Sequence, residues 1–580
     1  MEITSLKIIL ANLVERIELG DDGKYRFSGI ITPKEYEALN YLISDLNSSN
    51  GSTANDVEDL ISKANILGQE VLKEFNQEHH LNDNPSNKQI ELDLSSLSLP
   101  EPASTMRVCM DFGTAMSKAT FVDDGEDDSY EDIRVLNLGI PGDQEQVDPI
   151  MLVSSVYIDQ DAKIWFGQHA VEQAEAATES STSRIDNIKR ALSEDNLDEL
   201  LSNDYNPTSL DLSYQDIVLS YLMFFTWAIN HSLANDFGDE IPRNIKRRFA
   251  MPCFPRPNAR KVEAKLKTML GEAQVLADTF NDIMHDGVPL HDFLIALKKL
   301  RSEKRTYSFI DCSVTEPLGV AGSLLSWNNN SNSLVLVVDI GAGTSDFSLY
   351  RLKVDIVDDH TVRSTAGEVD GTARGISEAG NHLDKILMGL ILRKSGINTN
   401  NPRYRNVTHA LERDIRNYKE SLFSPTAEAT ITLYNGDPVD VTLEEFLAEP
   451  AVKSFERSLR ETMVNILESA HEDWVNWVRA HPSRRLTIVL TGGGSTLPMV
   501  RKLAEGTVTA HGITIPVAAA KSFPEWLRDD FPDLEEHYPR VAVSLGGARK
   551  HTIQSMGVLK STGISGEREY KLERFVTRGV

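Results

Sequence analysis

Short apolar runs that end in glycine recur from residue 106 onward, and longer stretches with helical patterning separate them. Three examples are RVCMDFG from Arg107, SLVLVVDIG from Ser333 and RLTIVLTGGG from Arg485. Apolar runs of this length, bounded by glycine, are typical of buried strands. Their alternation with helical stretches predicts an α/β fold for this part of the chain.

The sequence before residue 106 has a different pattern. Residues 1–82 are patterned mainly as helix. Residues 83–105 are rich in Asn, Ser and Pro, which is typical of a linker, although the alternating apolar residues from Ile90 to Leu94 also fit a short docked strand. We predict an accessory, mainly helical N-terminal domain over residues 1–82 and a linker over residues 83–105.

One apolar stretch is long enough to consider as a membrane-spanning helix. Residues 217–234 carry no formal charge. However, polar residues interrupt the stretch, no basic residues flank it, and Ser213-Tyr-Gln-Asp216 has the form of a helix capping box. We therefore expect a helix buried between layers of the α/β domain and no membrane insertion.

Two glycine turns form an internal repeat. Asp111-Phe-Gly-Thr-Ala-Met-Ser117 follows one apolar run, and Asp339-Ile-Gly-Ala-Gly-Thr-Ser345 follows another in the same register. After each turn the apolar residues alternate again, so each turn is expected to join two strands. A Walker loop or a Rossmann turn would lead into a helix, and both are therefore disfavoured. The repeat predicts two related lobes.

These turns have residues suited to binding phosphate. Glycine lets the backbone come close to a bulky anion and exposes several N–H groups in one concave place. Two facing turns would hold a polyphosphate from both sides. Asp111 and Asp339, each at a strand end, suit a hydrated Mg²⁺ beside the phosphates. One such turn alone is often only a hairpin, so the hypothesis depends on further motifs.

Three further segments supply such motifs. TGGGSTLP, residues 491–498, follows an apolar run and precedes a helix, so its glycine backbone can face a flat ligand. Glu316, in Thr315-Glu316-Pro317, lies shortly before Asp339. AGNHLDKIL, residues 379–387, places Gly380 at the start of a helix that can cover a ribose or a base.

Composition narrows the possible classes of function. The 580 residues contain 87 Asp and Glu against 59 Lys and Arg, and the net charge of −28 argues against direct nucleic-acid binding. Apolar residues make up 41% and charged residues 25%, which is ordinary for a globular chain with several cores. Three cysteines without a CxxC pair and a start without a basic n-region predict a cytoplasmic protein.

Taken together, the motifs resemble the nucleotide-binding domain shared by DnaK-type heat-shock chaperones, actin and sugar kinases. DFGTAMS and DIGAGTSDFSLYRL resemble its two phosphate motifs, and TGGGSTLPMV resembles its adenosine motif. The DnaK-type branch fits best, since TEPLGVA, STAGE, AGNHLD and AVSLGGA approximate its signatures in the same order. The opening Asp-x-Gly-Thr-Ala is most similar to divergent bacterial relatives.

The resemblance implies a fold and a division of the chain. The fold is an actin-like two-lobed ATPase fold, built from duplicated ribonuclease-H-like subdomains, with the helical N-terminal domain as an addition. The ATPase domain would span residues 106–551 with an insertion near 280–308, and residues 552–580 would form a C-terminal tail. The implied ligands are ATP or ADP and Mg²⁺.

The resemblance also assigns roles to the positions that match. It places the phosphates between Gly113, Thr114, Ala115 and Met116 on one side and Gly341, Ala342, Gly343 and Thr344 on the other. It implies metal binding through Asp111 and Asp339. It implies catalytic roles for Asp346, which would orient the attacking water, and for Glu316, Lys189 and Thr344. It implies nucleoside contacts for Gly380, Lys419, Gly493 and Gly494. A solvated helix lysine is the alternative interpretation of Lys189.

The chain departs from the chaperone pattern in two places. Glu420 and Phe423 stand where the chaperones clamp the nucleoside with arginine and serine, which leaves the identity of the base open. After Gly547 the sequence has neither the acidic-leucine linker nor a β-sandwich peptide-binding domain. A protein partner or client is therefore expected at the N-terminal domain or at the 280–308 insertion. For the basic run KKLRSEKR of that insertion, a solvated helix face is the simpler interpretation.

These features predict a slow, Mg²⁺-dependent ATPase that acts as a DnaK-like conformational switch on or with a protein partner. Two alternatives stay open. One is an actin-like, filament-forming ATPase of the segregation type. The other is a metabolite kinase of the same fold, for which no motif supplies a base for an acceptor hydroxyl.

Overall fold

The fold was analysed in a computed structural model. It describes residues 17–19, 25–27, 90–125, 131–139, 148–177, 182–193, 196–238, 245–251, 256–324, 330–358, 361–424, 427–433, 438–520 and 523–562. The accessory domain predicted for residues 1–82 lies outside the described residues, apart from a two-stranded antiparallel hairpin of β1 (Ile17–Leu19) and β2 (Tyr25–Phe27).

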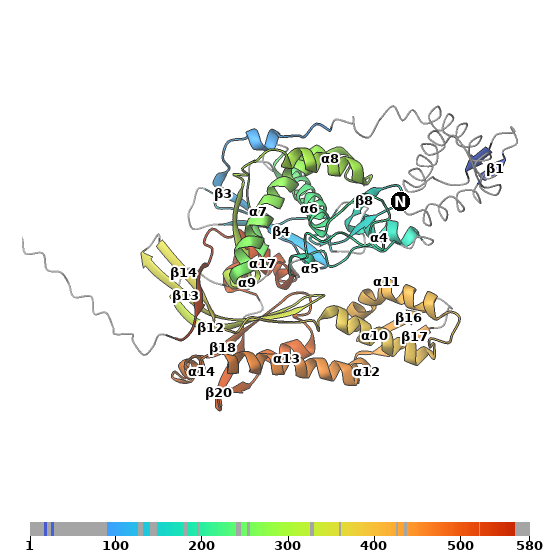
Figure 1. The fold of residues 1–580 in the computed structure, drawn as a ribbon. Coiled ribbons are helices and arrows are strands. Elements are labelled where there is room, and N and C mark those ends of the chain that lie inside the picture. Colours follow the sequence, from blue (N-terminus) through green and yellow to red (C-terminus); the bar gives the residue numbers. More distant parts are fainter. Residues whose placement is uncertain are drawn as a thin grey trace, which may run out of the picture.

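A six-stranded mixed sheet, the first sheet, lies in the upper part of the molecule in Figure 1. Its strand order is β11-β9-β3-β4-β5, and β6 pairs with β4. Strand β4 runs antiparallel to both β3 and β5, whereas β9 runs parallel to β3 and β11 parallel to β9. Its strands are β3 (Ala103–Asp111), β4 (Met116–Asp123), β5 (Asp132–Val135), β6 (Leu152–Val153), β9 (Ile245–Met251) and β11 (Ile310–Thr315).

An eight-stranded mixed sheet, the second sheet, lies in the lower part (Figure 1). Its order is β19-β20-β18-β12-β13-β14-β21, and β15 pairs with β13. Its strands are β12 (Ser331–Ile340), β13 (Ser345–Asp358), β14 (Thr361–Val369), β15 (Arg374–Ile376), β18 (Leu486–Thr491), β19 (Thr507–Ala510), β20 (Ile513–Ala519) and β21 (Gln554–Leu559).

The two sheets repeat one topology. In each, the first three strands in chain order are antiparallel neighbours: β3, β4 and β5 in one sheet, and β12, β13 and β14 in the other. In each, the next central strand, β9 or β18, pairs parallel to the first, and a fifth, β11 or β20, pairs parallel to it. The predicted α/β class is therefore confirmed, and the sequence repeat at the two glycine turns coincides with a repeat of strand order.

Helices cover both faces of each sheet, and the alternation of side chains along the strands explains this. Along β12, Leu334 and Leu336 face one hydrophobic cluster, whereas Val335 and Val337 face another. The first sheet is covered on its outer face by α6 (Tyr214–Phe237), α7 (Arg256–Thr279) and α8 (Leu290–Arg301). The second sheet is covered on its outer face by α13 (Pro450–Ser469) and α14 (Glu472–Arg479). Helices α10 (Gly380–Ser395) and α11 (Tyr404–Leu422) pack against each other and against the hairpin of residues 428–442, beyond one end of this sheet (Figure 1).

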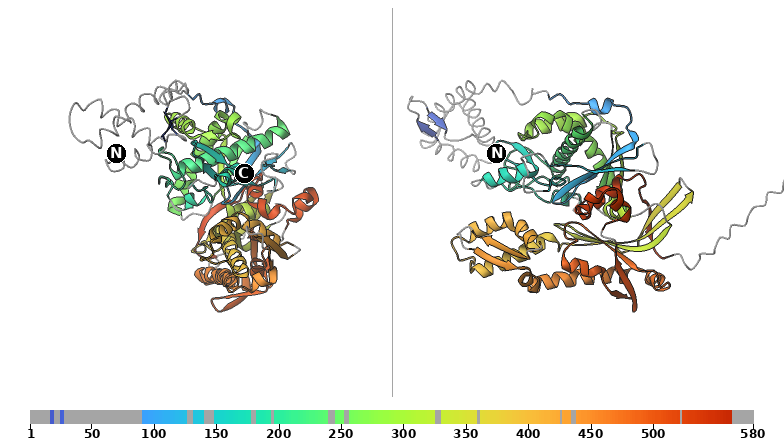
Figure 2. Two further views of the ribbon diagram at one scale, coloured as in Figure 1. Left: turned by 90° about the vertical axis from the view of Figure 1, so that its right-hand side faces the viewer. Right: turned by 180° about the vertical axis from the view of Figure 1, so that it is seen from behind.

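Two helices lie between the sheets, α9 (Glu316–Leu324) and α17 (Tyr538–Ala548), as Figures 1 and 2 show. Glycines bring their backbones into contact. A Cβ atom on Gly546 would overlap the carbonyl oxygen of Gly319 and would lie 2.5 Å from the backbone nitrogen of Ser323. The hydroxyls of Ser323 and Tyr538 are 2.7 Å apart and link the two helices in the buried interior. This crossing joins the two sheets.

Arginines of the first sheet bind the C-terminal end of α17. Arg107 Nε donates to the carbonyl oxygen of Ala548 at 2.7 Å, and Arg248 Nη1 donates to that of Arg549 at 2.7 Å. Arg107 is buried and is also paired with Asp124. Because the free carbonyls at a helix C-terminus carry partial negative charge, these cations stabilise the end of α17 against the first sheet.

Helix α6 is the stretch considered above as a membrane span. It begins with the predicted capping box, in which Ser213 and Asp216 each bind the other's backbone N–H. Among the described residues it is the one helix long and apolar enough to span a membrane, and 83% of its apolar window is buried inside the protein. Its neighbours are α7 and the strands of the first sheet, so the prediction of a buried core helix is confirmed.

Smaller elements complete the two halves. Next to the first sheet, β7 (Val156–Ile158), β8 (Lys163–Phe166) and β10 (Val288–Pro289) form a small antiparallel sheet beside α4 (Gly167–Ala176), and α5 (Arg190–Ser193) follows. Next to the second sheet, β16 (Glu428–Thr432) and β17 (Pro438–Thr442) form a hairpin before α12 (Leu443–Ala448). Two short helices, α15 (Pro498–Arg501) and α16 (Glu525–Asp530), and the single turns η1 (Ser95–Ser98), η3 (Asn281–Ile283), η4 (Lys502–Ala504) and η5 (Pro532–Leu534) are also present.

The segments predicted to flank or interrupt the main domain are partly integrated into it. Residues 90–94 pack against the core of the first half without forming a strand, and β3 begins at Ala103. Within residues 280–308, β10 pairs with β8 and α8 packs into the core. Within residues 552–580, β21 pairs parallel to β14 in the second sheet.

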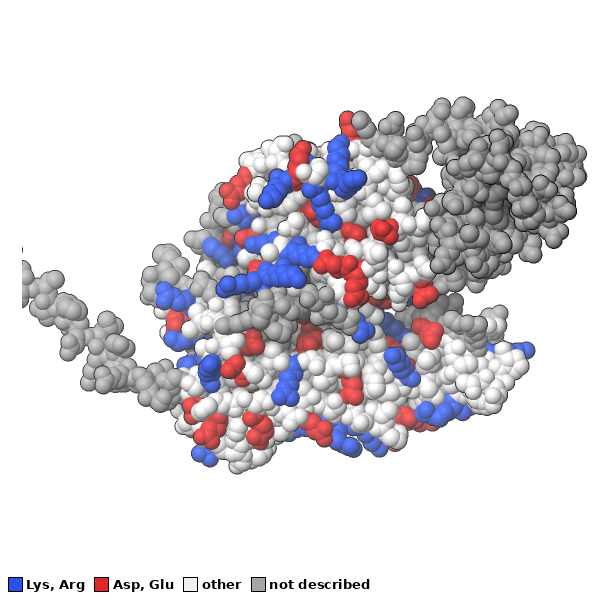
Figure 3. Space-filling model, viewed as in Figure 1, with Lys and Arg blue, Asp and Glu red and all other residues white. Residues whose placement is uncertain are grey.

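Lys and Arg side chains gather over the upper half of the face seen in Figure 3, where α7 and α8 lie. Within the basic run KKLRSEKR, Lys298 and Lys304 are exposed at the surface. Arg301 instead binds Glu272 through two nitrogens, at 2.9 and 3.0 Å. The run therefore has an exposed side and a side that holds α8 to α7.

Candidate phosphate-binding site between two glycine turns

The two glycine turns lie opposite each other between the sheets. Residues 112–115 join β3 to β4, and residues 341–344 join β12 to β13, so the prediction of strand-to-strand turns is confirmed. A Cβ atom on Gly343 would lie 3.5 Å from Thr114 Cγ2, which places the second turn directly against the first. The two turns therefore lie close enough to contact one ligand from both sides, as the polyphosphate hypothesis requires.

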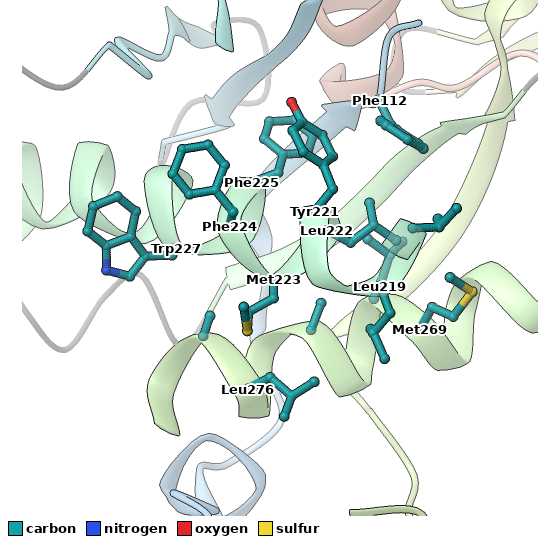
Figure 4. Close-up of a cluster of buried hydrophobic side chains, with 14 of the residues drawn as sticks. Phe112, Leu219, Tyr221, Leu222, Met223, Phe224, Phe225, Trp227, Met269 and Leu276 are labelled. Carbon is teal, nitrogen blue, oxygen red and sulfur yellow. The ribbon is translucent and has the colours of Figure 1, made fainter. Parts of the chain in front are cut away.

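The first turn is tight, and a hydrogen bond to a buried group of hydroxyls fixes its backbone. A Cβ atom on Gly113 would overlap the carbonyl oxygen of Met116, so no other residue fits this backbone. The Gly113 N–H donates to Ser117 Oγ at 3.3 Å. Ser117 Oγ, Ser154 Oγ and the Tyr221 hydroxyl form a buried triangle with sides of 3.0 to 3.2 Å. The ring of Tyr221 also stacks on that of Phe112, with ring centroids 5.4 Å apart. Figure 4 shows both rings in the buried cluster around α6.

Replacing Tyr221 with phenylalanine keeps the stacked ring and removes one of the three hydroxyls of the triangle. We expect the free energy of unfolding to fall by about 1 kcal/mol, since one buried hydrogen-bonded hydroxyl is lost. Urea denaturation followed by circular dichroism measures this change. Tyr157→Phe is the matched control, because the hydroxyl of this buried tyrosine has no hydrogen-bond partner among the described residues. An equal loss of stability in both variants would contradict the proposed importance of the triangle.

The second turn is joined to the start of α10. The N–H groups of Gly380 and Asn381 donate to the carbonyl oxygens of Gly341 and Ala342, at 3.1 and 2.8 Å. Lys419 Nζ lies 3.2 Å from the carbonyl oxygen of Gly380 and 2.7 Å from Asp384 Oδ1. The predicted nucleoside residues Gly380 and Lys419 thus lie beside the second turn.

The third glycine segment, residues 492–494, approaches the same strand end. Strand β18 lies parallel to β12, and Thr491 is paired with Asp339. Gly492 has a φ of +79°, and a Cβ atom there would overlap Asp339 Oδ1. Gly494 donates its N–H to the carbonyl oxygen of Ile340 at 2.9 Å. Gly493 has no atom within 4 Å of its Cβ position, so its backbone is open to a ligand.

Charged side chains from both halves meet between the turns. Asp111 ends β3, Glu316 follows β11, and Asp339 lies near the end of β12. Lys189 Nζ forms a hydrogen-bonded ion pair with Glu316, and both side chains are largely buried. Asp111 is also 3.9 Å from Lys118 Nζ. Lys189 is therefore not a solvated helix lysine, and that alternative is wrong.

These charges change one another's proton affinity. Burial raises the pKa of Asp339 to about 7, and the negative charges of Glu316, Asp346 and Asp111 act in the same direction. Burial also raises the pKa of Asp111, although Lys118 and Lys189 oppose the shift. For Lys189 burial alone would lower the pKa, but the carboxylates of Glu316 and Asp111 outweigh it and raise the pKa. Such a cluster of carboxylates is suited to binding a cation.

Asp346 lies at the mouth of the site. Thr344 Oγ1 donates to Asp346 Oδ2 at 2.7 Å, and both side chains are exposed to the space between the halves. Partial desolvation by neighbouring atoms raises the pKa of Asp346, and the Glu316 charge adds to this, whereas the Thr344 hydrogen bond opposes it. A carboxylate that is held by one hydroxyl and open to solvent can orient a water molecule.

The carboxylates fit a hydrated Mg²⁺ better than a directly ligated metal. Among the described residues, no three His, Cys, Asp or Glu side chains are placed to hold a metal ion together. Mg²⁺ usually keeps several waters and takes one or two carboxylates in addition to phosphate oxygens. Asp111 and Asp339, which end equivalent strands beside the two turns, match that requirement.

Glu420 and Phe423, the two predicted departures from the chaperone pattern, lie at the C-terminal end of α11 and directly after it. Glu420 forms an exposed ion pair with Arg416, one helical turn away, at 3.1 Å. The ring of Phe423 packs edge-on against Phe446, with centroids 6.0 Å apart. An acidic side chain and a partly buried aromatic one thus occupy these two positions.

Two features of the site were not predicted from the sequence. The hydroxyl triangle brings together Ser117, Ser154 and Tyr221 from three separate elements, and no local pattern marks it. Asn187, close to the second turn, has a φ of +58° that only the structure reveals.

No protein-family model matches the chain, and no curated protein matches it.

Proposed function

We propose that the protein binds ATP and Mg²⁺ between its two glycine turns and hydrolyses the ATP slowly. The observation that carries the proposal is the pair of facing turns: each follows an aspartate at or near a strand end, and a Cβ atom on Gly343 would be in van der Waals contact with Thr114. A pair of facing turns binds a polyphosphate better than one turn does, because both sides of the anion are contacted.

We also propose that the fold is the actin-like, two-lobed fold of DnaK-type ATPases. The repeated strand order of the two sheets supports this, and so do α9 and α17, which cross between the sheets. The glycine segment 492–494 and the start of α10 lie beside the second turn, where the nucleoside would extend from the phosphates.

The residues of the site have distinct roles in this proposal. The N–H groups of the two turns bind the phosphate oxygens, and Lys189 adds a positive charge near them. Asp111 and Asp339 would hold the hydrated Mg²⁺, which supplies charge neutralisation when bound. Asp346, held by Thr344, orients a water molecule in line with the terminal phosphorus and accepts its proton. The bond to the bridging oxygen breaks, and ADP and inorganic phosphate leave.

The same geometry suits a conformational switch. The phosphates would contact turns of both halves, so the bound nucleotide holds the halves together and hydrolysis weakens that contact. We propose that a protein partner or client reads this difference, through the N-terminal domain or through the 280–308 segment. Exposed basic side chains such as Lys298 and Lys304 make the latter suitable for an acidic partner.

Asp346→Ala tests the ATPase proposal. We expect phosphate release, measured with a colorimetric assay in Mg²⁺ and ATP, to fall at least about tenfold, because the attacking water loses its orienting base. ATP binding, measured by calorimetry, should persist. Asp440→Ala is the control, since Asp440 lies on β17 in the hairpin, far along the chain from the turns. Background release from wild type and variant alike would contradict the proposed hydrolysis.

A further inference from the structure

We propose that Asn187 is a binding residue for the terminal phosphate of a nucleoside triphosphate held between the turns. The inference rests on the proposed nucleotide site and names a side chain that no motif indicates. It explains three observations that are otherwise unconnected: a left-handed backbone, a side chain directed at the opposite turn, and an amide without a protein partner.

The backbone of Asn187 is left-handed, with φ at +58°. For residues other than glycine this conformation is uncommon, and asparagine is one of the few that adopt it at low cost. Non-glycine residues in such regions persist where the surroundings fix them, and they cluster at functional sites. The backbone of Asn187 is therefore an indication of function that needs independent support.

The surroundings do fix this residue. Ile185 exchanges two backbone hydrogen bonds with Val156 of β7, at 2.8 and 3.0 Å. Asp186 accepts a hydrogen bond from Ser155 Oγ at 2.6 Å. On the other side, the carbonyl oxygen of Asn187 accepts from the N–H of Arg190, the first residue of α5, at 2.8 Å. Hydrogen bonds thus fix the backbone on both sides of Asn187.

The side chain of Asn187 points across the site. Its Oδ1 atom lies 3.9 Å from the Cβ position of Gly343, and Thr114 Cγ2 lies 3.5 Å from the same position. Two residues further along, Lys189 enters the charged cluster with Glu316. Asn187 is therefore beside both turns and on the segment that carries the site's buried lysine.

The carboxamide of Asn187 is half-buried, and no described residue forms a hydrogen bond with it. An amide carries two N–H donors and a carbonyl acceptor, so it can donate to a phosphate oxygen without adding charge to the site. A third phosphate between the turns offers such an acceptor. The proposed contact therefore distinguishes a triphosphate from a diphosphate.

Asn187→Gly removes the carboxamide and keeps the left-handed backbone, which glycine adopts without strain. Calorimetric titration of the full chain with ATP and with ADP, each with Mg²⁺, measures the effect. We expect ATP to bind about tenfold more weakly, since a hydrogen bond to a charged group is lost, and ADP to bind within about twofold of wild type.

Two further variants serve as controls. Asn187→Asp has nearly the same shape and tolerates the same backbone, but its negative charge opposes the phosphate, so ATP affinity should fall at least as far as in Asn187→Gly. Ala162→Gly removes a side chain at another left-handed position, at the turn between β7 and β8, and should leave both affinities unchanged.

The outcomes separate this inference from the proposed function. Unchanged ATP affinity in Asn187→Gly, with ATP bound by wild type, would overturn the role of Asn187 alone. Equal weakening of ATP and ADP would also overturn it, because a purely structural role affects both ligands. No ATP binding by wild type would overturn the nucleotide site itself and the inference with it.

Discussion

Replacing Gly546 with alanine is expected to lower the free energy of unfolding by about 3 kcal/mol, because the added methyl group has no space between α9 and α17. It would overlap the carbonyl oxygen of Gly319 and lie 2.5 Å from the backbone nitrogen of Ser323. Both neighbours are backbone atoms of α9, so no side chain can rotate away. The helices must separate, and the buried cluster between the sheets loses contacts on both sides.

Gly389→Ala is the matched control for this prediction. Gly389 lies inside α10, and the nearest atom to its Cβ position is the flexible end of Arg393, at 3.5 Å. Alanine favours a helix by up to about 1 kcal/mol over glycine, so this variant should be more stable than wild type. Urea denaturation of the three proteins measures both changes. Similar stability of the Gly546→Ala variant and wild type would contradict the close contact of the two helices.

Asp339→Asn is expected to abolish Mg²⁺-dependent ATP hydrolysis and, at the same time, to stabilise the ligand-free protein at alkaline pH. Activity is lost because one of the two carboxylates proposed to hold the hydrated Mg²⁺ becomes neutral. Stability is gained because the ionised Asp339 is largely removed from water beside the negative charges of Glu316, Asp346 and Asp111. The amide has nearly the same shape and no charge.

The pH dependence follows from the direction of the pKa shift. The pKa of Asp339 is raised from 3.8 to about 7 in the folded chain, so folding favours its protonated form. The stabilising contribution of that form is complete below pH 4 and is lost as the pH rises through 7. We therefore expect the variant to exceed wild type by about 1 to 3 kcal/mol at pH 8 and by much less at pH 5.

Denaturation of the ligand-free proteins at pH 5 and pH 8, with Asp533→Asn as the control, measures this difference. Asp533 is an exposed aspartate in η5, and its replacement should change stability little at either pH. A wild type that is more stable than Asp339→Asn at pH 8 without Mg²⁺ or nucleotide would contradict the prediction.

Much of the fold could be predicted because its signals are local. The continuous apolar run before Asp339 indicates a strand buried on both faces, and in the structure Leu334 and Val335 do face different clusters. The glycine turns indicated strand-to-strand connections by the alternation that follows them. The crossing of α9 and α17 carries no such signal, because the tight fit of Gly546 depends on Gly319, far away in the chain.

The charged residues of the site could also be predicted from local sequence, whereas Asn187 could not. Asp111 and Asp339 each follow an apolar run and Glu316 directly precedes Pro317, and the structure brings the three into one charged cluster with Lys189. Asn187 was missed because nothing in RIDNIKRAL marks its left-handed backbone, which lies two residues after Ile185, the residue that pairs with Val156 of β7. Tertiary contacts of this kind override local sequence preference.

The place of α17 in the chain affects the order in which the protein is made. The inner face of the first sheet, with Cys109, Val122 and Ile133, is covered by a helix that begins only at Tyr538. At roughly 5 to 20 residues per second, a ribosome needs roughly 10 to 40 seconds to pass from the end of α9 to the start of α17. During that time the first half is folded on one side only, and its other apolar face is available to chaperones that bind nascent chains.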